Sequence, residues 1–322
     1  MFERTAVVLC NLGGPDSLDA VRPFLFNLFS DPDIFRFPLG FLTQRPLAAL
    51  IAWRRAPEAA HGYAAIGGKS PILEYTRAQA EALQRAIGGE FDVHVCMRYW
   101  HPLTDEVVSK LKQRNYPRVI LVPLYPQYSR TTSGSSYNEF MRQCRRQDYQ
   151  PSVTLIRQWY EQPDYQNAIV ETVRSEANKL PDPDPAHFEL LFSAHGLPKK
   201  IVAEGDPYEQ QVRATYDAVR ARLGWPHTTL CYQSRVGPLE WLRPYTDDVV
   251  REKAAAGVKQ MLVYPIAFVS DHVETLFELG ITYAELARSR GIEHYRVVPA
   301  LNNHPRFIEA LRSLVLDAAQ RP

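Results

Sequence analysis

The stretch "LLFSAHGLP", Leu190–Pro198, indicates a repeated fold when it is compared with the N-terminus. It is an apolar run that ends in small and polar residues before a glycine and a proline. "VVLCNLGGP", Val7–Pro15, has the same form. Each stretch is typical of a buried strand followed by a tight turn.

Two further pairs recur in the same order along the chain. "CMRYWHPLTDEVV" (Cys96–Val108) parallels "CYQSRVGPLEWLRPYTDDVV" (Cys231–Val250), and "VILVPLYP" (Val119–Pro126) parallels "QMLVYPIAF" (Gln260–Phe268). Because three matches in one order are hard to attribute to chance, we predict two similar domains related by duplication.

Short β-branched runs alternate with amphipathic stretches, which predicts βαβ units and parallel sheets covered by helices on both faces. The expected strands are Ala6–Leu12, Phe91–Arg98, Arg118–Leu124, Val153–Arg157, Phe188–Ser193, Thr228–Gln233, Gln260–Ile266 and Tyr295–Pro299. The expected helices include Ile72–Ile87, Asp105–Arg114, Asp164–Leu180, Tyr208–Leu223 and Val273–Arg290. We place the domains at 1–150 and 151–322, with the last helix a candidate to pack back on the first domain.

The first half carries extra residues after its first strand. Val7 and Cys96 are 89 positions apart, whereas Leu190 and Cys231 are 41 apart, a difference of 48. The surplus contains the segment 23–57, with six phenylalanines, one tryptophan and two acids. This segment is either an amphipathic subdomain that packs on its own sheet or an apolar lip for a flat ligand or a membrane surface, ending in Arg54 and Arg55.

Composition excludes several classes of protein. The 322 residues include 45% hydrophobic and 23% charged residues, and 37 basic residues nearly balance 36 acidic ones, which argues against a nucleic-acid partner. The four cysteines have no CxxC spacing and favour reduced thiols in a cytoplasmic setting. The N-terminal apolar run is too short for a signal peptide, and no apolar run approaches the roughly 20 residues of a membrane span. We expect a soluble or at most peripheral protein.

Ligands of open parallel sheets bind beyond the carboxyl ends of the strands, so the residues there are the candidates for a site. His195 follows an expected strand directly and precedes Gly196, which suits a cleft, although a hydrogen-bonded structural histidine is the commoner alternative. The chain has neither G-x-G-x-x-G nor G-x-x-x-x-G-K-[ST], so neither a dinucleotide nor a nucleoside triphosphate is indicated.

The second candidate is "SDHVETLFE", residues 270–278. Asp271 and Glu274 have the spacing of a helix capping box, which leaves Glu278 unexplained. The stripe Leu276, Leu279, Tyr283 and Leu286 is expected to form the core face, so the two glutamates face either water or a cleft. A histidine with carboxylates at facing strand ends suits a divalent cation or proton transfer near neutral pH.

At these residues the chain resembles the ferrochelatase family. The resemblance runs along nearly the whole chain and includes "LCNLGGP", "RRAPEAAHGYAAIGGKSPI", "RYWHPLT", "LYPQYSRTTSGSS", "SAHGLP", "GDPYEQQV", "YQSRVGPLEWLRPYTDD" and "PIAFVSDHVETLFEL". It implies an α/β protein of two similar Rossmann-like domains, each a parallel sheet flanked by helices, with a porphyrin cleft between them. It also implies insertion of Fe²⁺ into protoporphyrin IX, with release of two protons, as the last step of haem synthesis.

The resemblance assigns roles to individual residues. It makes His195 and Glu274 the central pair for catalysis and the metal, and Asp271, His272 and Glu278 a supporting proton path. The porphyrin-side positions that it implies are Arg55, Tyr63, Ser70, Arg98, Tyr99, Tyr125, Tyr128 and Trp241.

The chain departs from the family pattern at two places. "FELGITY" has Gly280 and Thr282 where the family often has acids, so the acidic line is expected to stop at Glu278. The last cysteine is Cys231, so the iron–sulfur cluster of some members is expected to be absent. No permanent cofactor is expected, because Fe²⁺ is a substrate. The long apolar lip favours protoporphyrin over coproporphyrin and allows peripheral contact with the inner membrane face.

Two alternatives remain at this stage. One is a related chelatase that inserts cobalt or iron into a tetrapyrrole precursor. The other is a metal- or porphyrin-binding protein without catalysis.

Overall fold

The computed structural model describes residues 4–35, 37, 39–237 and 239–321, apart from the side chain of Phe41. Arg36 and Pro38, inside the expected lip, lie outside the described residues. The chain forms two compact units. The first contains residues up to Trp159 and residues from Ile308 onward, and the second contains Tyr160–Phe307.

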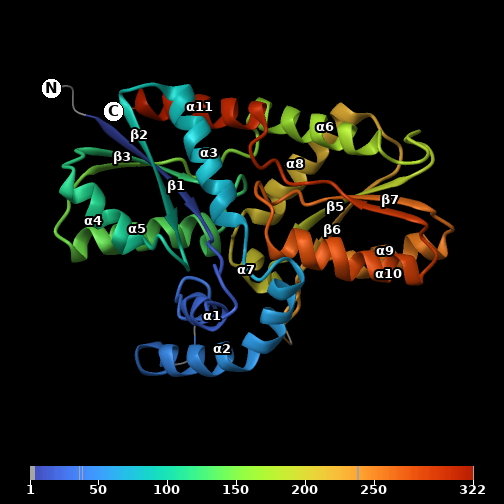
Figure 1. The fold of residues 1–322 in the computed structure, drawn as a ribbon, viewed down its shortest axis with the longest axis horizontal. Coiled ribbons are helices and arrows are strands. Elements are labelled where there is room, and N and C mark those ends of the chain that lie inside the picture. The colour runs from blue at the N-terminus through green and yellow to red at the C-terminus, as the bar shows by residue number, and fades with distance from the viewer. Residues whose placement is uncertain (1–3, 36, 38, 238, 322) are drawn as a thin grey trace. The chain divides into compact units, whose positions relative to one another are not determined.

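Each unit holds a four-stranded sheet in which all paired strands are parallel (Figure 1). The first sheet has the order β2-β1-β3-β4, with strands β1 (Thr5–Asn11), β2 (Phe91–Met97), β3 (Arg118–Pro123) and β4 (Ser152–Leu155). The second sheet has the order β6-β5-β7-β8, with strands β5 (Glu189–His195), β6 (Thr228–Gln233), β7 (Gln260–Tyr264) and β8 (His294–Val297). All eight predicted strands are confirmed within a few residues at each end.

Helices connect these strands in both units. Those of the first are α1 (Val21–Phe29), α2 (Gly40–Ala65), α3 (Ile72–Ile87), α4 (Thr104–Gln113), η1 (Arg130–Gly134) and α5 (Ser135–Arg146). Those of the second are α6 (Pro163–Ala177), α7 (Lys199–Ala203), α8 (Tyr208–Leu223), α9 (Thr246–Ala255), η2 (Glu274–Thr282) and α10 (Tyr283–Ser289). The last helix, α11 (Pro305–Ala319), lies mostly in the first unit, where Arg118 donates to the carbonyls of Ala318 and Ala319.

The predicted likeness of the two halves is confirmed at the level of strand order and register. Both sheets place their first strand between the second and the third. Cys96 lies opposite Cys10 in the first sheet, and Cys231 lies opposite Ser193 in the second. The two cysteines of the sequence repeat therefore occupy equivalent positions.

The boundary expected at residue 150 is wrong. β4 begins at Ser152 and pairs with β3, so it completes the first sheet. Trp159 then donates its ring N–H to the carbonyl of Pro123 at 2.9 Å. Because these contacts belong to the first sheet, the first unit extends to Trp159.

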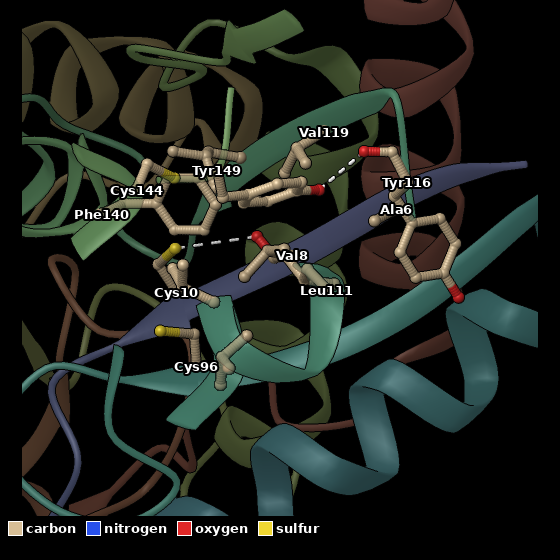
Figure 2. Packing of buried hydrophobic residues seen from close by; sticks show 13 residues of the cluster. Ala6, Val8, Cys10, Cys96, Leu111, Tyr116, Val119, Phe140, Cys144 and Tyr149 are labelled. Atoms are coloured by element: carbon tan, nitrogen blue, oxygen red, sulfur yellow. Dashed lines mark hydrogen bonds between the residues drawn. The ribbon is translucent and has the colours of Figure 1, made fainter. Parts of the chain in front are cut away.

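The core of the first unit follows the twofold alternation of its strands (Figure 2). Ala6, Val8 and Cys10 point to one face of β1, where they pack with Phe140 and Cys144 of α5. In the second unit the corresponding face packs on α9, η2 and α10. All four cysteines are buried free thiols, as predicted.

Helix α2 has two unlike faces. Ala48 and Ala52 are buried, on a helix that packs against α1. The exposed large apolar side chains of this region are Leu39, Leu42, Leu50 and Trp53. Leu42 and Trp53 are eleven residues apart, about three helical turns, so they share one side. The segment thus packs on α1 through small side chains and presents an exposed apolar stripe on another side. Among the described residues, no helix is long and apolar enough to cross a membrane.

The predicted helix Val273–Arg290 begins as a π-helix, η2, and continues as α10. The wider turn changes which side chains face the core: Leu279 is fully buried, and Thr275, four residues earlier, is 1% exposed. Leu276, expected in the core, is 37% exposed. The expected core stripe is therefore wrong at its first position.

Candidate active site

The candidate site of the second unit begins at the last residue of β5, His195. Gly196 follows because a side chain there would meet the carbonyl of Gln233 at 2.8 Å and the ring of Trp241 at 3.2 Å. The Gly196 N–H donates to that same carbonyl at 2.8 Å. The His195 side chain is 38% exposed, so a ligand can reach it.

The central contact joins His195 to Glu274, the first residue of η2. The distance from His195 Nδ1 to Glu274 Oε2 is 2.8 Å. Burial lowers the pKa of His195, but the charge and hydrogen bond of Glu274 outweigh it, and the net pKa is raised. Burial likewise raises the pKa of Glu274, but His195 holds it well below the usual range. Glu274 therefore accepts a hydrogen bond from His195 across two elements far apart in sequence, and its charge favours the protonated form of the imidazole.

This contact also fixes the state of the imidazole ring. An ionised carboxylate can only accept, so the His195 Nδ1 carries a proton. In the neutral ring the other nitrogen, Nε2, then has a free lone pair. His195 can thus accept a proton or bind a metal through Nε2 while Glu274 orients it.

His272 is buried next to Glu274. Its Nδ1 is 3.2 Å from the carbonyl of Ser270 and donates to it. Its Nε2 is 3.8 Å from Glu274 Oε1, beyond hydrogen-bond distance. The structure therefore places His272 beside the central pair, next to the carboxylate oxygen farther from His195.

Glu278 is joined to Glu274 through Ser234, the residue after β6. The Ser234 hydroxyl lies 3.0 Å from Glu274 Oε2 and 2.5 Å from Glu278 Oε2. The Ser234 N–H and the Tyr283 hydroxyl both donate to Glu278 Oε1, at 3.0 and 2.9 Å. Burial and the nearby charge of Glu274 raise the pKa of Glu278. Glu278 therefore faces a polar network rather than open water.

Asp271 does not join this network, and the expected capping box is absent. Its carboxylate accepts from Thr275 at 2.9 Å and from Asn302 at 2.6 Å. Its N–H donates to Asn302 at 2.9 Å, and Glu274 instead binds His195. The spacing of the acids predicted a capping box. It could not show that His195, on β5, binds the Glu274 carboxylate instead.

Two aromatic side chains flank the His195 ring edge-on. The ring centroid of Trp241 is 6.4 Å away, and that of Phe268 is 6.2 Å away. The Trp241 N–H donates to the carbonyl of Val236 at 3.0 Å. The candidate site thus sets a histidine–carboxylate pair among aromatic ring edges, an environment that suits a flat aromatic ligand.

The other porphyrin-side candidates belong to the first unit. Arg55 is partly exposed and 3.6 Å from Glu58, whereas Tyr125 and Tyr128 are half-buried. Tyr63 and Ser70 are buried. The Ser70 hydroxyl lies where a side chain at Gly14 would be, so Ser70 packs on the turn after β1.

Arg98 and Tyr99 meet at a buried carboxylate that the sequence did not single out as a site residue. Asp31, in the turn after α1, accepts from Arg98 at 2.9 Å and from the Tyr99 hydroxyl at 2.6 Å. The Ser135 hydroxyl donates to the same oxygen at 2.5 Å. Tyr99 is 1% exposed, so its hydroxyl serves this network and not a ligand. The network adjoins a hollow of about 510 Å³ that Asp31, Arg98 and Arg142 help to line.

The described residues contain no group of three or more His, Cys, Asp or Glu side chains with the geometry to hold a metal ion. The metal contact predicted at His195 and Glu274 involves two residues only. Such a contact is weaker than the closed four-ligand sites that retain structural zinc.

Comparison with known proteins decides the family. The ferrochelatase family model matches residues 4–319. The chain is 48% identical over 330 residues to a ferrochelatase of Nostoc sp. (99% of this chain, 83% of the relative). It is 47% identical over 330 residues to a ferrochelatase of Thermosynechococcus vestitus (100% of this chain, 84% of the relative). The chain belongs to the ferrochelatase family. Membership identifies it as a metal-chelating enzyme that inserts iron into a porphyrin.

Solved structures show the same fold as this ferrochelatase-family chain at low sequence identity. The sirohydrochlorin chelatase SirB from Bacillus subtilis subspecies spizizenii, in complex with cobalt, matches with a TM-score of 0.59 and 10% identity (99% of this chain, 97% of that chain). CbiX, the terminal enzyme of siroheme biosynthesis in denitrifying bacteria, matches with a TM-score of 0.55 and 12% identity (98% and 99%). The chelatase-like fold predicted from sequence is confirmed.

Sequence reasoning missed two residues of the candidate site. Ser234 follows a strand, which is a signal, but its bridging role depends on a left-handed backbone conformation, φ 64°. Tyr283 was assigned to the core stripe, yet its hydroxyl donates to Glu278. Neither contact follows from hydrophobic periodicity, because both depend on the π-helical register of η2.

Proposed function

We propose that this protein inserts Fe²⁺ into protoporphyrin IX and releases two protons, as the last step of haem biosynthesis, with His195 and Glu274 as the catalytic pair. The observation that carries the assignment of residues is the 2.8 Å contact between them at the end of β5. It lies in a chain that matches ferrochelatases over nearly its whole length.

The porphyrin must lose two pyrrole protons while its nitrogens take up the metal. His195 Nε2, left free by the Glu274 contact, is the group that receives a proton from the macrocycle. The resulting imidazolium is stabilised by Glu274. With Nδ1 held by Glu274, Nε2 points away from the carboxylate, so Fe²⁺ would meet one borderline nitrogen ligand there and would reach a Glu274 oxygen only in place of the Nδ1 contact. Either contact would bind the ion without trapping it.

Protons leave through Ser234 towards Glu278. The Ser234 hydroxyl has one hydrogen for two carboxylates, Glu274 and Glu278. A proton on Glu278 allows Glu278 to donate to Ser234 and Ser234 to donate to Glu274. The raised pKa of Glu278 supports that role. The path therefore runs from His195 through Glu274 and Ser234 to Glu278, with His272 beside it and Asp271 outside it.

Two separate sets of residues are candidates for porphyrin contact: the rings beside His195 in the second unit and exposed groups of the first unit. Trp241 presents its ring next to His195, and Arg55 offers a partly exposed guanidinium that suits a propionate. Tyr125 and Tyr128 are half-buried candidates for the same ligand. The remaining candidates are mostly buried and would support the residues that touch substrate; they are Tyr63, Ser70, Arg98 and Tyr99. A cleft between the two domains stays a prediction.

The exposed stripe of α2 supports two finer assignments. Its apolar side chains favour the less charged protoporphyrin over coproporphyrin. The stripe, flanked by Arg45 and Arg54, also suits the surface of an anionic membrane, so we place the enzyme in the cytoplasm with peripheral contact at the inner membrane face.

Catalysis needs no resident cofactor in this proposal, and no iron–sulfur cluster. Such a cluster takes four cysteine thiolates at one place. Here three of the four cysteines belong to the core of the first unit and Cys231 belongs to that of the second.

The test is anaerobic metal insertion by the purified protein, followed by the porphyrin absorption spectrum. Protoporphyrin with Fe²⁺ should be converted to protohaem at catalytic rates, and coproporphyrin should react more slowly. Parallel reactions with sirohydrochlorin and Co²⁺ test the related chelatase. Stoichiometric binding of porphyrin without turnover would instead favour a carrier protein.

A further inference from the structure

Helix α8 begins at Tyr208, inside the motif "GDPYEQQV" that the catalytic proposal does not use. The Tyr208 hydroxyl donates to the backbone carbonyl of His195 at 2.9 Å. Asp206 accepts from the Tyr208 N–H at 3.1 Å and so shapes the turn before the helix. Tyr208 is 8% exposed, and burial raises the pKa of its hydroxyl well above the ordinary value. The hydroxyl therefore remains a donor.

We propose that Tyr208 is a positioning residue for His195: its hydroxyl holds the main chain of His195 so that the imidazole meets both Glu274 and the substrate. This proposal rests on the proposed catalytic role of His195.

The backbone of His195 needs this additional hydrogen bond because, at His195, β5 is no longer paired with a strand on both sides. β7 pairs with β5 only as far as Phe192, and the Ile266 N–H then reaches the carbonyl of Ser193. At His195 the pairing continues only on the β6 side, opposite Gln233. The bond from Tyr208 fixes the carbonyl of His195 two residues further along. Rotation of that peptide would turn the His195 ring away from Glu274.

The same helix supplies a matched control. Tyr216 lies two turns further along α8, is also 8% exposed, and also donates to a strand carbonyl, that of Thr228 at 3.0 Å. Thr228 is the first residue of β6, at the end of the sheet opposite to His195. The substitutions Tyr208→Phe and Tyr216→Phe thus remove the same kind of bond from the same helix, and only the first lies beside the site.

The experiment compares the two variants in the anaerobic assay and by NMR of ring-¹⁵N-labelled histidine. Tyr208→Phe should lower kcat about tenfold, because a displacement of about 1 Å in a catalytic group costs up to about a hundredfold. Its KM for protoporphyrin should stay within about twofold, as expected for a group that touches no substrate. Tyr216→Phe should keep kcat within about twofold, with a similar small loss of melting temperature. The His195 signal, assigned with His195→Asn, should shift only in Tyr208→Phe.

Equal kcat in the two variants, or an unshifted His195 signal in Tyr208→Phe, would overturn the positioning role. An inactive wild-type protein would instead count against the proposed function, and the NMR comparison would still decide whether Tyr208 orients His195. The two failures are therefore distinguishable.

Discussion

Ser234 holds Glu278 with both its backbone and its side chain. Its N–H donates to Glu278 Oε1 at 3.0 Å, and its hydroxyl lies 2.5 Å from Glu278 Oε2. The backbone of Ser234 is left-handed, φ 64°, a conformation that costs a residue with a Cβ about 1–2 kcal/mol. The active-site network therefore depends on a locally unfavourable backbone.

The pair Ser234→Ala and Ser234→Gly separates the hydroxyl from the backbone. Both variants lose the bridge to Glu274 and Glu278, so both should lower kcat, by about tenfold for a hydrogen bond to a charged group. Ser234→Gly also relieves the left-handed strain and should unfold at higher denaturant than Ser234→Ala. Anaerobic rates and urea unfolding measure the two effects. Wild-type kcat in both variants would remove Ser234 from the proton path.

Glu278 should make stability depend on pH. Its pKa is raised in the folded protein by burial and by the charge of Glu274. Between its unfolded value, about 4.3, and the folded value, the native state binds more protons, so this group lowers stability as pH rises through that window.

The variant Glu278→Gln removes this titration. We expect it to be more stable than wild type near pH 7, by about 1 kcal/mol, and to lose that advantage at pH 4. Its kcat should fall, because the amide cannot carry the proton. Urea unfolding at the two pH values provides the measurement. A variant less stable than wild type at pH 7 would show that ionised Glu278 does not destabilise the folded protein.

Gly196 should not tolerate a side chain. In Gly196→Ala the new methyl group would lie 2.8 Å from the carbonyl of Gln233 and 3.2 Å from the ring of Trp241. We expect a loss of about 1–3 kcal/mol and a displaced Trp241. Gly89→Ala is the control, since nothing lies within 4 Å of a side chain there. Thermal unfolding and tryptophan fluorescence report the result, and equal stability of the two variants would be inconsistent with a crowded turn after His195.

Substitution of Asp31 should lower the free energy of unfolding more than substitution of Asp33, the other acid after α1. Asp31→Asn leaves the Arg98 charge without its closest partner at a buried site and should cost about 3 kcal/mol. Asp33 pairs with Arg142 at 3.2 Å nearer the surface, so Asp33→Asn should cost at most about 1 kcal/mol. Denaturant unfolding of both compares them. A reversed order would show that the Asp31 network does not anchor this turn.

The sequence was sufficient for the strands: apolar runs with turn signals predicted all eight. It also placed His195 at the end of a strand, where the structure has it. The contact between His195 and Glu274 was implied by the family resemblance and is present, whereas the catalytic role of the pair stays a prediction. The π-helix was not readable, because a hydrophobic pattern of period near four does not distinguish a wide turn from an ordinary one. Because of that error, Leu276 was predicted to lie in the core, and the contact of the Tyr283 hydroxyl with Glu278 was not predicted. The capping role of Asp271 failed for another reason, since Glu274 has a long-range partner that local spacing cannot show.

The most direct test of the central claim is the rate of anaerobic Fe²⁺ insertion in His195→Ala and Glu274→Ala, alongside porphyrin binding by fluorescence. His195 supplies the free Nε2 and Glu274 holds it in place, so each substitution should reduce kcat by at least about a hundredfold while protoporphyrin still binds and the fold persists. Turnover at the wild-type rate in both variants would contradict the assignment of this pair.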